Sequence, residues 1–193
     1  GEGDKFLGVT VPATRSVAKR YKDVPYEVLE ALLESEWHEC RLCALLILIE
    51  KYKQSPEDAV NFYLGHTAGI NNWDLVDLSA PYILGDYLSN QENRRILYEL
   101  AGSPDMWEQR ISVVSTLMLI RRGFYMDTIE LAKKFIDTKC DLIQKAVGWM
   151  LREVGKRNED LLISFLDEYR HRMPRTMLRY AIERFKSRYI CGS

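Results

Sequence analysis

The chain has 193 residues, of which 47% are hydrophobic, and its formal net charge is −1. This composition suffices for one core or one continuous solenoid spine, and no composition break indicates a second domain, so we expect a single domain over residues 1–193. The longest apolar run, residues 42–49, is far too short to cross a bilayer, which excludes it as a membrane span.

The charge is distributed unevenly along the chain. Residues 1–96 contain 10 Lys and Arg against 15 Asp and Glu, whereas residues 97–193 contain 17 against 13. A basic C-terminal half is typical of a protein that contacts a polyanion such as nucleic acid, and it is also what ordinary solvated helices produce. The charge alone therefore leaves both interpretations open.

The sequence contains four cysteines and no secretory leader ahead of them, at Cys40, Cys43, Cys140 and Cys191. This pattern predicts reduced thiols in a cytoplasmic protein rather than a disulfide framework. The first two cysteines form a CxxC, but it lies inside a helical run without a second pair, and the histidines are widely scattered. We therefore expect no metal site and no organic cofactor.

Helix signals occur throughout the chain. Prolines stand near the start of apolar-periodic segments, at Pro12, Pro25, Pro56, Pro104 and Pro174. Ser103 before Pro104 predicts an N-cap followed by the first helical residue, and Gly123 and Gly155 suit helix ends. No segment alternates strictly between apolar and polar residues with turn residues on both sides, so we predict no strand and an all-α fold.

A recurrence underlies these helices. Basic residues begin similar apolar segments at Arg41, Arg110, Lys145 and Arg179, with spacings of 69, 35 and 34 residues, and the first spacing divides into two units around Val76. A period near 35 residues carried by helix pairs predicts an α-solenoid of HEAT-like repeats, in which one helix of each pair lines a concave groove.

One constellation points to chemistry. Trp73 and Asp77 in NNWDLVDL are one helical turn apart, so an aromatic plane and a carboxylate project from the same side of a helix and can contact one small cation. The repeat period places Arg110 and Trp149 at the same level of the following repeats. The alternative for Trp73 and Asp77 is a core indole and an interhelical or capping carboxylate.

The segment around Trp149 combines an aromatic ring with cations. Lys145, Trp149, Arg152 and Lys156 form one helical stripe, beside an apolar stripe of Leu142, Ala146, Met150 and Val154. A ring among three cations suits a phosphate backbone, with a sugar or base packed on the ring. The alternative is a tryptophan at the edge of the core, covered by the aliphatic stems of its neighbours.

The remaining candidates are arginines. Arg110 lies in the middle of an apolar helical stripe and must be paired. Either it is structural, as Arg41 is expected to be, and bonds a carboxylate or a helix end, or it reaches into the groove near Asp77. Arg175 and Arg179 either grip phosphates at the C-terminal end or belong to a solvated rim.

The chain resembles the AlkD family of bacterial DNA alkylation repair glycosylases, whose fold is a curved stack of HEAT-like repeats. The segments that carry the resemblance are FLGVTVPATR, NNWDLVD, MWEQR, DLIQKAVGWMLREVGKR and MPRTMLRYAIERF, which together cover nearly the whole chain. The most specific are the WDxVD pair and the KAxGWxLRE helix. The resemblance implies that Trp73, Asp77, Arg110 and Trp149 occupy the catalytic positions.

The resemblance also implies an activity, the removal of cationic N3- and N7-alkylated purines from double-stranded DNA by a monomer. Such a base is already a good leaving group, so no general acid is needed, and Asp77 would stabilise the oxocarbenium ion and hold the attacking water. The alternative, from a different class, is a noncatalytic HEAT-like scaffold that binds DNA or a protein.

The N-terminus departs from the family pattern. Members usually carry a further helical segment before the FLG motif, which here occupies residues 6–8. We therefore expect N-terminal capping helices to be missing from this sequence. If such helices help to grip DNA, their absence would weaken the activity.

Overall fold

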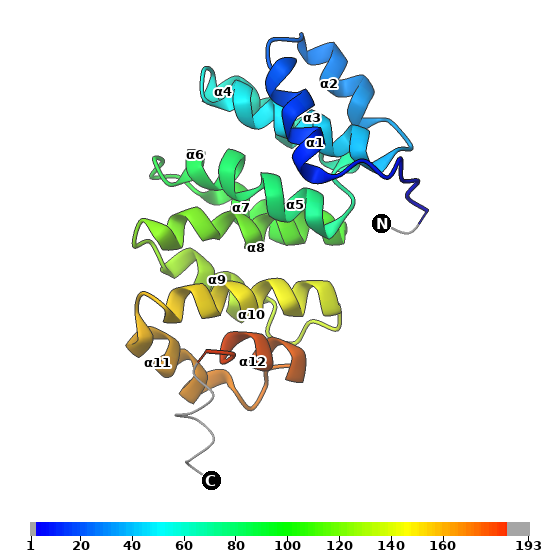
Figure 1. The fold of residues 1–193 in the computed structure, drawn as a ribbon. Coiled ribbons are helices and arrows are strands. Elements are labelled where there is room, and N and C mark those ends of the chain that lie inside the picture. The colour runs from blue at the N-terminus through cyan, green and yellow to red at the C-terminus, as the bar shows by residue number, and fades with distance from the viewer. Residues whose placement is uncertain (1–2, 185–193) are drawn as a thin grey trace. The chain divides into compact units, whose positions relative to one another are not determined.

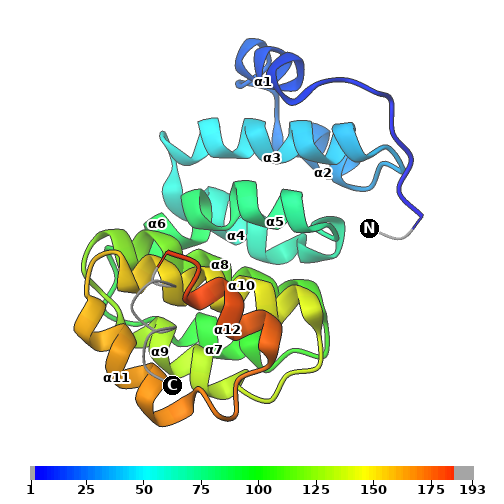
Figure 2. The same ribbon diagram turned by 60° about the horizontal axis from the view of Figure 1, so that its bottom comes forward.

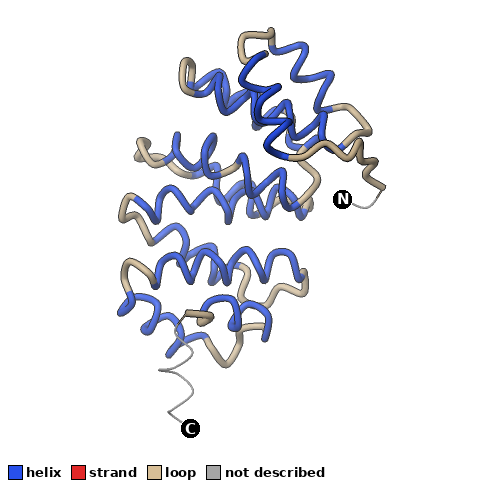
Figure 3. The backbone as a smooth tube through the Cα atoms, in the orientation of Figure 1, coloured by secondary structure: helices blue, strands red, loops and turns tan. Residues whose placement is uncertain are grey.

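The computed structural model describes residues 3–184, and within this range helices joined by loops account for the fold without any strand (Figures 1 and 3). The all-α prediction is confirmed. The chain divides into two compact units, residues 1–90 and residues 91–193.

The first unit is built around one long central helix. Its helical elements are α1 (Val11–Arg20), α2 (Tyr26–Leu33), α3 (His38–Tyr52), α4 (Pro56–Gly65), the 3-10 turn η1 (Thr67–Gly69), α5 (Trp73–Ser79), the π-helical turn η2 (Pro81–Gly85) and α6 (Asp86–Leu88). Helices α1, α2, α4 and α5 all pack against α3. Because four helices surround it, α3 buries side chains on most of its circumference, including Leu45 and Leu48.

A proline determines where α5 ends. Pro81 has no backbone N–H to continue the helical ladder. The chain continues in a wider π-helical turn, in which the Gly85 amide donates to the Ala80 carbonyl at 2.9 Å. Helix α5 is therefore only seven residues long.

The second unit is a series of helix pairs. Its helices are α7 (Arg95–Ala101), α8 (Met106–Arg121), α9 (Met126–Lys134), α10 (Asp141–Gly155), α11 (Glu159–Tyr169) and α12 (Arg175–Ala181). Helix α10 packs between α8 and α12, while α7, α9 and α11 pack on the α8 and α10 layer (Figures 1 and 2). Helices at the predicted repeat positions 110, 145 and 179 are confirmed as α8, α10 and α12.

The approach of α10 to α12 requires a glycine. A Cβ placed on Gly148 would lie 2.5 Å from the Met177 carbonyl oxygen and 2.6 Å from the Tyr180 Cβ. Both distances are shorter than van der Waals contact, so any side chain here would push the two helices apart. The glycine of the KAVGWM segment is thus explained by packing.

The predicted helix ends are mostly found, with one correction. Gly123 follows α8 with φ of 88°, and Gly155 is the last residue of α10. The N-cap predicted at Ser103 is wrong, because α8 begins at Met106 and its N-cap is Asp105, whose carboxylate accepts from the Trp107 amide. The aspartate two residues later supplies the capping oxygen.

Candidate functional site

Helix α5 presents the aromatic ring and the carboxylate that the sequence singled out. Trp73, the first residue of α5, is 56% exposed, so it is not a core indole. Asp77 follows one turn later and is half-buried. The two residues therefore share a short helix whose start is open to solvent.

The end of α5 is tied to α4 by a buried hydroxyl chain. Ser79 Oγ donates to the Leu75 carbonyl at 2.6 Å, so the Tyr63 hydroxyl donates to Ser79 Oγ at 2.9 Å. Burial raises the pKa of Tyr63, and the negative charge of Asp77 adds to this shift. The phenol therefore stays protonated and acts as a fixed neutral donor near Asp77.

The start of α5 is tied to a polar cluster of Asp4, His38, Arg41, Asn72 and Asp74. His38 and Arg41 at its centre are buried and the other three residues are half-buried, and we call this group the buried polar cluster. Asn72 Nδ2 donates to Asp4 Oδ2, and His38 Nε2 donates to Asp74 Oδ2, both at 2.8 Å. Arg41 Nη2 donates to Asp4 Oδ1 at 2.6 Å, which confirms the structural role expected of Arg41. Burial alone would raise the pKa of Asp4, but hydrogen bonding, including that from Asn72, and the charge of Arg41 hold it well below the usual value.

The FLG motif has a local structural role in the same unit. The backbone amides of Leu7, Gly8 and Val9 all donate to the buried Glu39 carboxylate, at 2.9, 2.8 and 3.3 Å. Gly8 has φ of 79°, which favours glycine and lets successive amides point at one anion. These bonds attach the N-terminal arm, residues 3–10, to the start of α3. In Figure 2 the arm passes beside that end of the helix.

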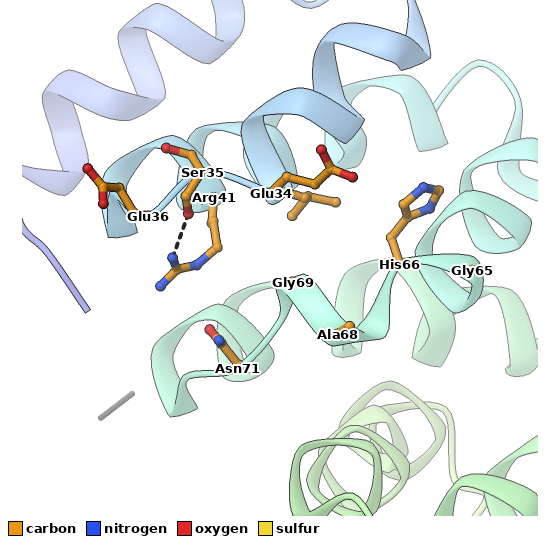
Figure 4. Close-up of a pocket in the computed structure, with 10 residues that line it drawn as sticks. Glu34, Ser35, Glu36, Arg41, Gly65, His66, Ala68, Gly69 and Asn71 are labelled. Atoms are coloured by element: carbon orange, nitrogen blue, oxygen red, sulfur yellow. Dashed lines mark hydrogen bonds between the residues drawn. The ribbon is translucent and has the colours of Figure 1, made fainter. Parts of the chain in front are cut away.

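Within the first unit, a pocket of about 490 Å³ lies between the α2–α3 turn and the α4–η1 segment (Figure 4). Glu34 and His66 extend toward each other across it, and Arg41 donates to the Ser35 carbonyl at 2.8 Å. His66 lies directly after α4, as its C-cap residue. None of the predicted site residues lines this pocket.

Helix α10 has the two faces that its sequence predicts. Ala146, Met150 and Val154 are fully buried, whereas the stripe with Trp149, which is half-buried, meets solvent.

The cations of this stripe have carboxylate partners within the second unit. Lys145 Nζ lies 2.6 Å from Asp141 Oδ2, a hydrogen bond that raises the pKa of Lys145. Arg152 pairs with Glu183, and Lys156 pairs with Glu153. A polyanion that binds this face would therefore have to replace the carboxylates with which these cations are already paired.

The predicted arginines differ in exposure. Arg110 is only 4% exposed, and its Nη1 donates to the Leu142 carbonyl in the first turn of α10 at 2.6 Å. A bond to a helix end is what the sequence predicted if Arg110 is structural. Arg175 and Arg179 of α12 are exposed, and the Arg179 guanidinium lies 5.7 Å from the centre of the Tyr180 ring.

The sequence did not predict most contacts of the buried polar cluster, nor the three backbone amides that donate to Glu39. The available signal was the segment WHECR, in which His38, Glu39 and Arg41 stand together at the start of a strongly apolar helix. Buried charges in such a position need partners, and these come from the N-terminal arm and from α5.

Across residues 3–184, no group of three or more His, Cys, Asp and Glu side chains could hold a metal ion. No helix in that part of the chain has the length and apolarity needed to span a membrane.

The comparisons with known proteins agree with this architecture. The family model described as DNA alkylation repair enzyme matches residues 1–185, so the chain belongs to the DNA alkylation repair enzyme family. No curated protein matches the sequence. A solved structure described as a predicted DNA alkylation repair enzyme from Enterococcus faecalis superposes with a TM-score of 0.81 at 20% identity, over 94% of this chain and 88% of that chain.

The family and the structural likeness establish two different things. The structural neighbour shows that the chain has a helical-repeat fold. Membership of the family assigns the protein to DNA alkylation repair, with DNA as its partner.

Proposed function

We propose that this protein is a DNA glycosylase that hydrolyses the N-glycosidic bond of cationic N3- and N7-alkylated purines in double-stranded DNA. In this reaction the bond between C1′ and the base breaks, and its electron pair neutralises the base. Water then bonds to C1′ and gives up a proton. We further propose that the protein acts as a cytoplasmic monomer without a metal or organic cofactor.

Asp77 is the residue proposed to accelerate the reaction. As an anion it stabilises the positive charge that develops on the deoxyribose and orients the attacking water. A carboxylate about 4 Å from that charge, at an effective dielectric near 20, contributes roughly 4 kcal/mol, which is about a thousandfold in rate. This suffices for a labile cationic lesion and not for a neutral base.

The tryptophans and Arg110 are proposed to complete the site. The rings of Trp73 and Trp149 each add about 0.5–2 kcal/mol through cation–π contact with the sugar or base. Arg110 fixes the first turn of α10, the helix that carries Trp149, through its bond to the Leu142 carbonyl. Contacts to DNA phosphates are proposed for Lys145, Arg152, Lys156, Arg175 and Arg179.

The observation that carries the proposal is the placement of Trp73 and Asp77 on one short helix whose start is exposed, in a chain of the alkylation repair family. The exposed indole keeps a large apolar surface available for contact, and its face attracts a cation. A cationic nucleotide satisfies both the ring and the carboxylate.

The substitution Asp77→Asn tests the proposal. It keeps the size of the side chain and removes the charge, so we expect release of 7-methylguanine from duplex DNA to fall by about a thousandfold. DNA affinity should hold or rise, because a repulsion with phosphates is removed. Unchanged release by Asp77→Asn, or no release by the unsubstituted protein, would leave a noncatalytic binding scaffold as the function.

A further inference from the structure

The two residues that flank Trp73 are both held by the buried polar cluster. Asn72, just before α5, donates to Asp4, and Asp74, just after Trp73, accepts from His38. The Trp73 side chain projects from between these two anchored positions and is exposed. The direction of the Trp73 side chain therefore depends on Asp4 and His38, which hold its two neighbours.

Helix α5 is too short to determine its own start. A helix of seven residues is unstable by itself, and its position comes from tertiary contacts. Asn72 occupies the N-cap position but makes no side-chain capping bond, because its amide is directed to Asp4. The Asp74 carboxylate instead accepts from the Leu75 amide at 2.8 Å through its other oxygen.

His38 is one of two links between the start of α5 and the rest of the cluster, the other being Asn72. Its side chain is 6% exposed, with Nε2 bonded to Asp74 and Nδ1 lying 3.4 Å from Asp4 Oδ2. The Phe6 ring packs against the imidazole with 5.1 Å between ring centres. The imidazole is thus confined on several sides and can hold Asp74 in one place.

We propose that His38 is a positioning residue for the glycosylase reaction, which fixes the first turn of α5 through Asp74 and so sets the direction of the Trp73 ring and the Asp77 carboxylate. The inference rests on the proposed function for its kinetic consequence. Its structural part, the bond between His38 and Asp74, is tested separately from the reaction.

Two substitutions at His38 separate positioning from general stability. Glutamine places an amide nitrogen near the position of Nε2 and can keep the bond to Asp74, whereas asparagine is shorter and places its nitrogen near Nδ1. Both remove the imidazole and its contact with Phe6. His66→Asn serves as a control, because the polar partners of His66 are the Phe62 carbonyl on α4 and the Glu30 carboxylate on α2.

The experiment combines a spectroscopic and a kinetic measurement on the full chain. With 5-fluorotryptophan incorporated, the fluorine NMR signal of Trp73 is assigned by its loss in Trp73→Phe. Single-turnover release of 7-methylguanine and DNA affinity are then measured below the melting temperature of every variant. We expect His38→Asn to shift or broaden the Trp73 signal and to slow release about tenfold or more, with DNA affinity within about twofold, since a misplaced catalytic group lowers the rate.

The matched variants should behave differently. His38→Gln should restore the Trp73 signal and bring release to within about threefold of the unsubstituted protein. His66→Asn should leave both unchanged. If the Trp73 signal is the same in His38→Asn as in the unsubstituted chain, or if asparagine and glutamine slow release equally, the positioning role is wrong. Absence of release by the unsubstituted chain would overturn the proposed function, while the fluorine signals would still decide the structural role of His38.

Discussion

Helices α5 and α10 carry Asp77 and the two tryptophans of the proposed site, and they are held in place by different kinds of contact. Helix α5 has seven residues and is anchored at both ends by directional hydrogen bonds, through His38 and Asp74 at its start and Tyr63 and Ser79 at its end. Helix α10 has fifteen residues and is held by an apolar face packed between α8 and α12. Substitutions around α5 should therefore affect the reaction more than stability, and those within α10 the reverse.

The largest expected effect on stability is at Gly148. Gly148→Ala places a methyl group against the Met177 carbonyl and the Tyr180 side chain, where no space exists, and should lower the free energy of unfolding by about 2 kcal/mol or more. Urea denaturation measures this change. Gly65→Ala is the matched control, because no atom lies within 4 Å of a Cβ there. Equal stability of the two variants would contradict the packing account of α10.

A smaller effect, on the reaction alone, is expected at Trp73. Trp73→Leu removes the ring from the exposed start of α5 and should slow release of 7-methylguanine about tenfold, through lost cation–π contact. The free energy of unfolding should change by less than about 0.5 kcal/mol, because the side chain is exposed. A large loss of stability with an unchanged rate would show that the ring is a packing element.

The smallest effect is expected at the N-terminal arm and depends on pH. Burial alone would raise the pKa of Glu39, but the amides of Leu7, Gly8 and Val9 lower it below its usual value. The stability that Glu39 contributes is therefore present above its unfolded pKa of about 4.3 and is lost as the pH falls through the lowered folded value. Glu39→Gln should reduce the fall in melting temperature on acidification from neutral pH, and an unchanged profile would contradict this role.

The sequence predicted the helices well because their signals are local. Prolines near helix starts, glycines at helix ends and the apolar stripe of α10 each depend on residues a few positions apart, and all are found. The misplaced N-cap at Ser103 shows the limit of such signals, since Asp105 competes for the same role two residues later. The predicted N-cap was therefore displaced by two residues.

The polar contacts around α5 were beyond sequence reasoning because they join distant residues. Asn72 and Asp4 are separated by 68 positions, and His38 and Asp74 by 36. Their sequence signal is only that charged residues stand beside apolar ones, which does not identify partners. The burial of Arg110 was expected from its helical stripe, whereas its acceptor, the Leu142 carbonyl, was not.

The most direct test of the account compares two bases in the same duplex. The purified chain is incubated with matched DNA duplexes that contain either one 7-methylguanine or one uracil, and the released base is quantified. Because Asp77 and the tryptophans stabilise a cation and no general acid is invoked, the account predicts release of 7-methylguanine and no appreciable release of uracil. Comparable excision of the uncharged base would contradict it.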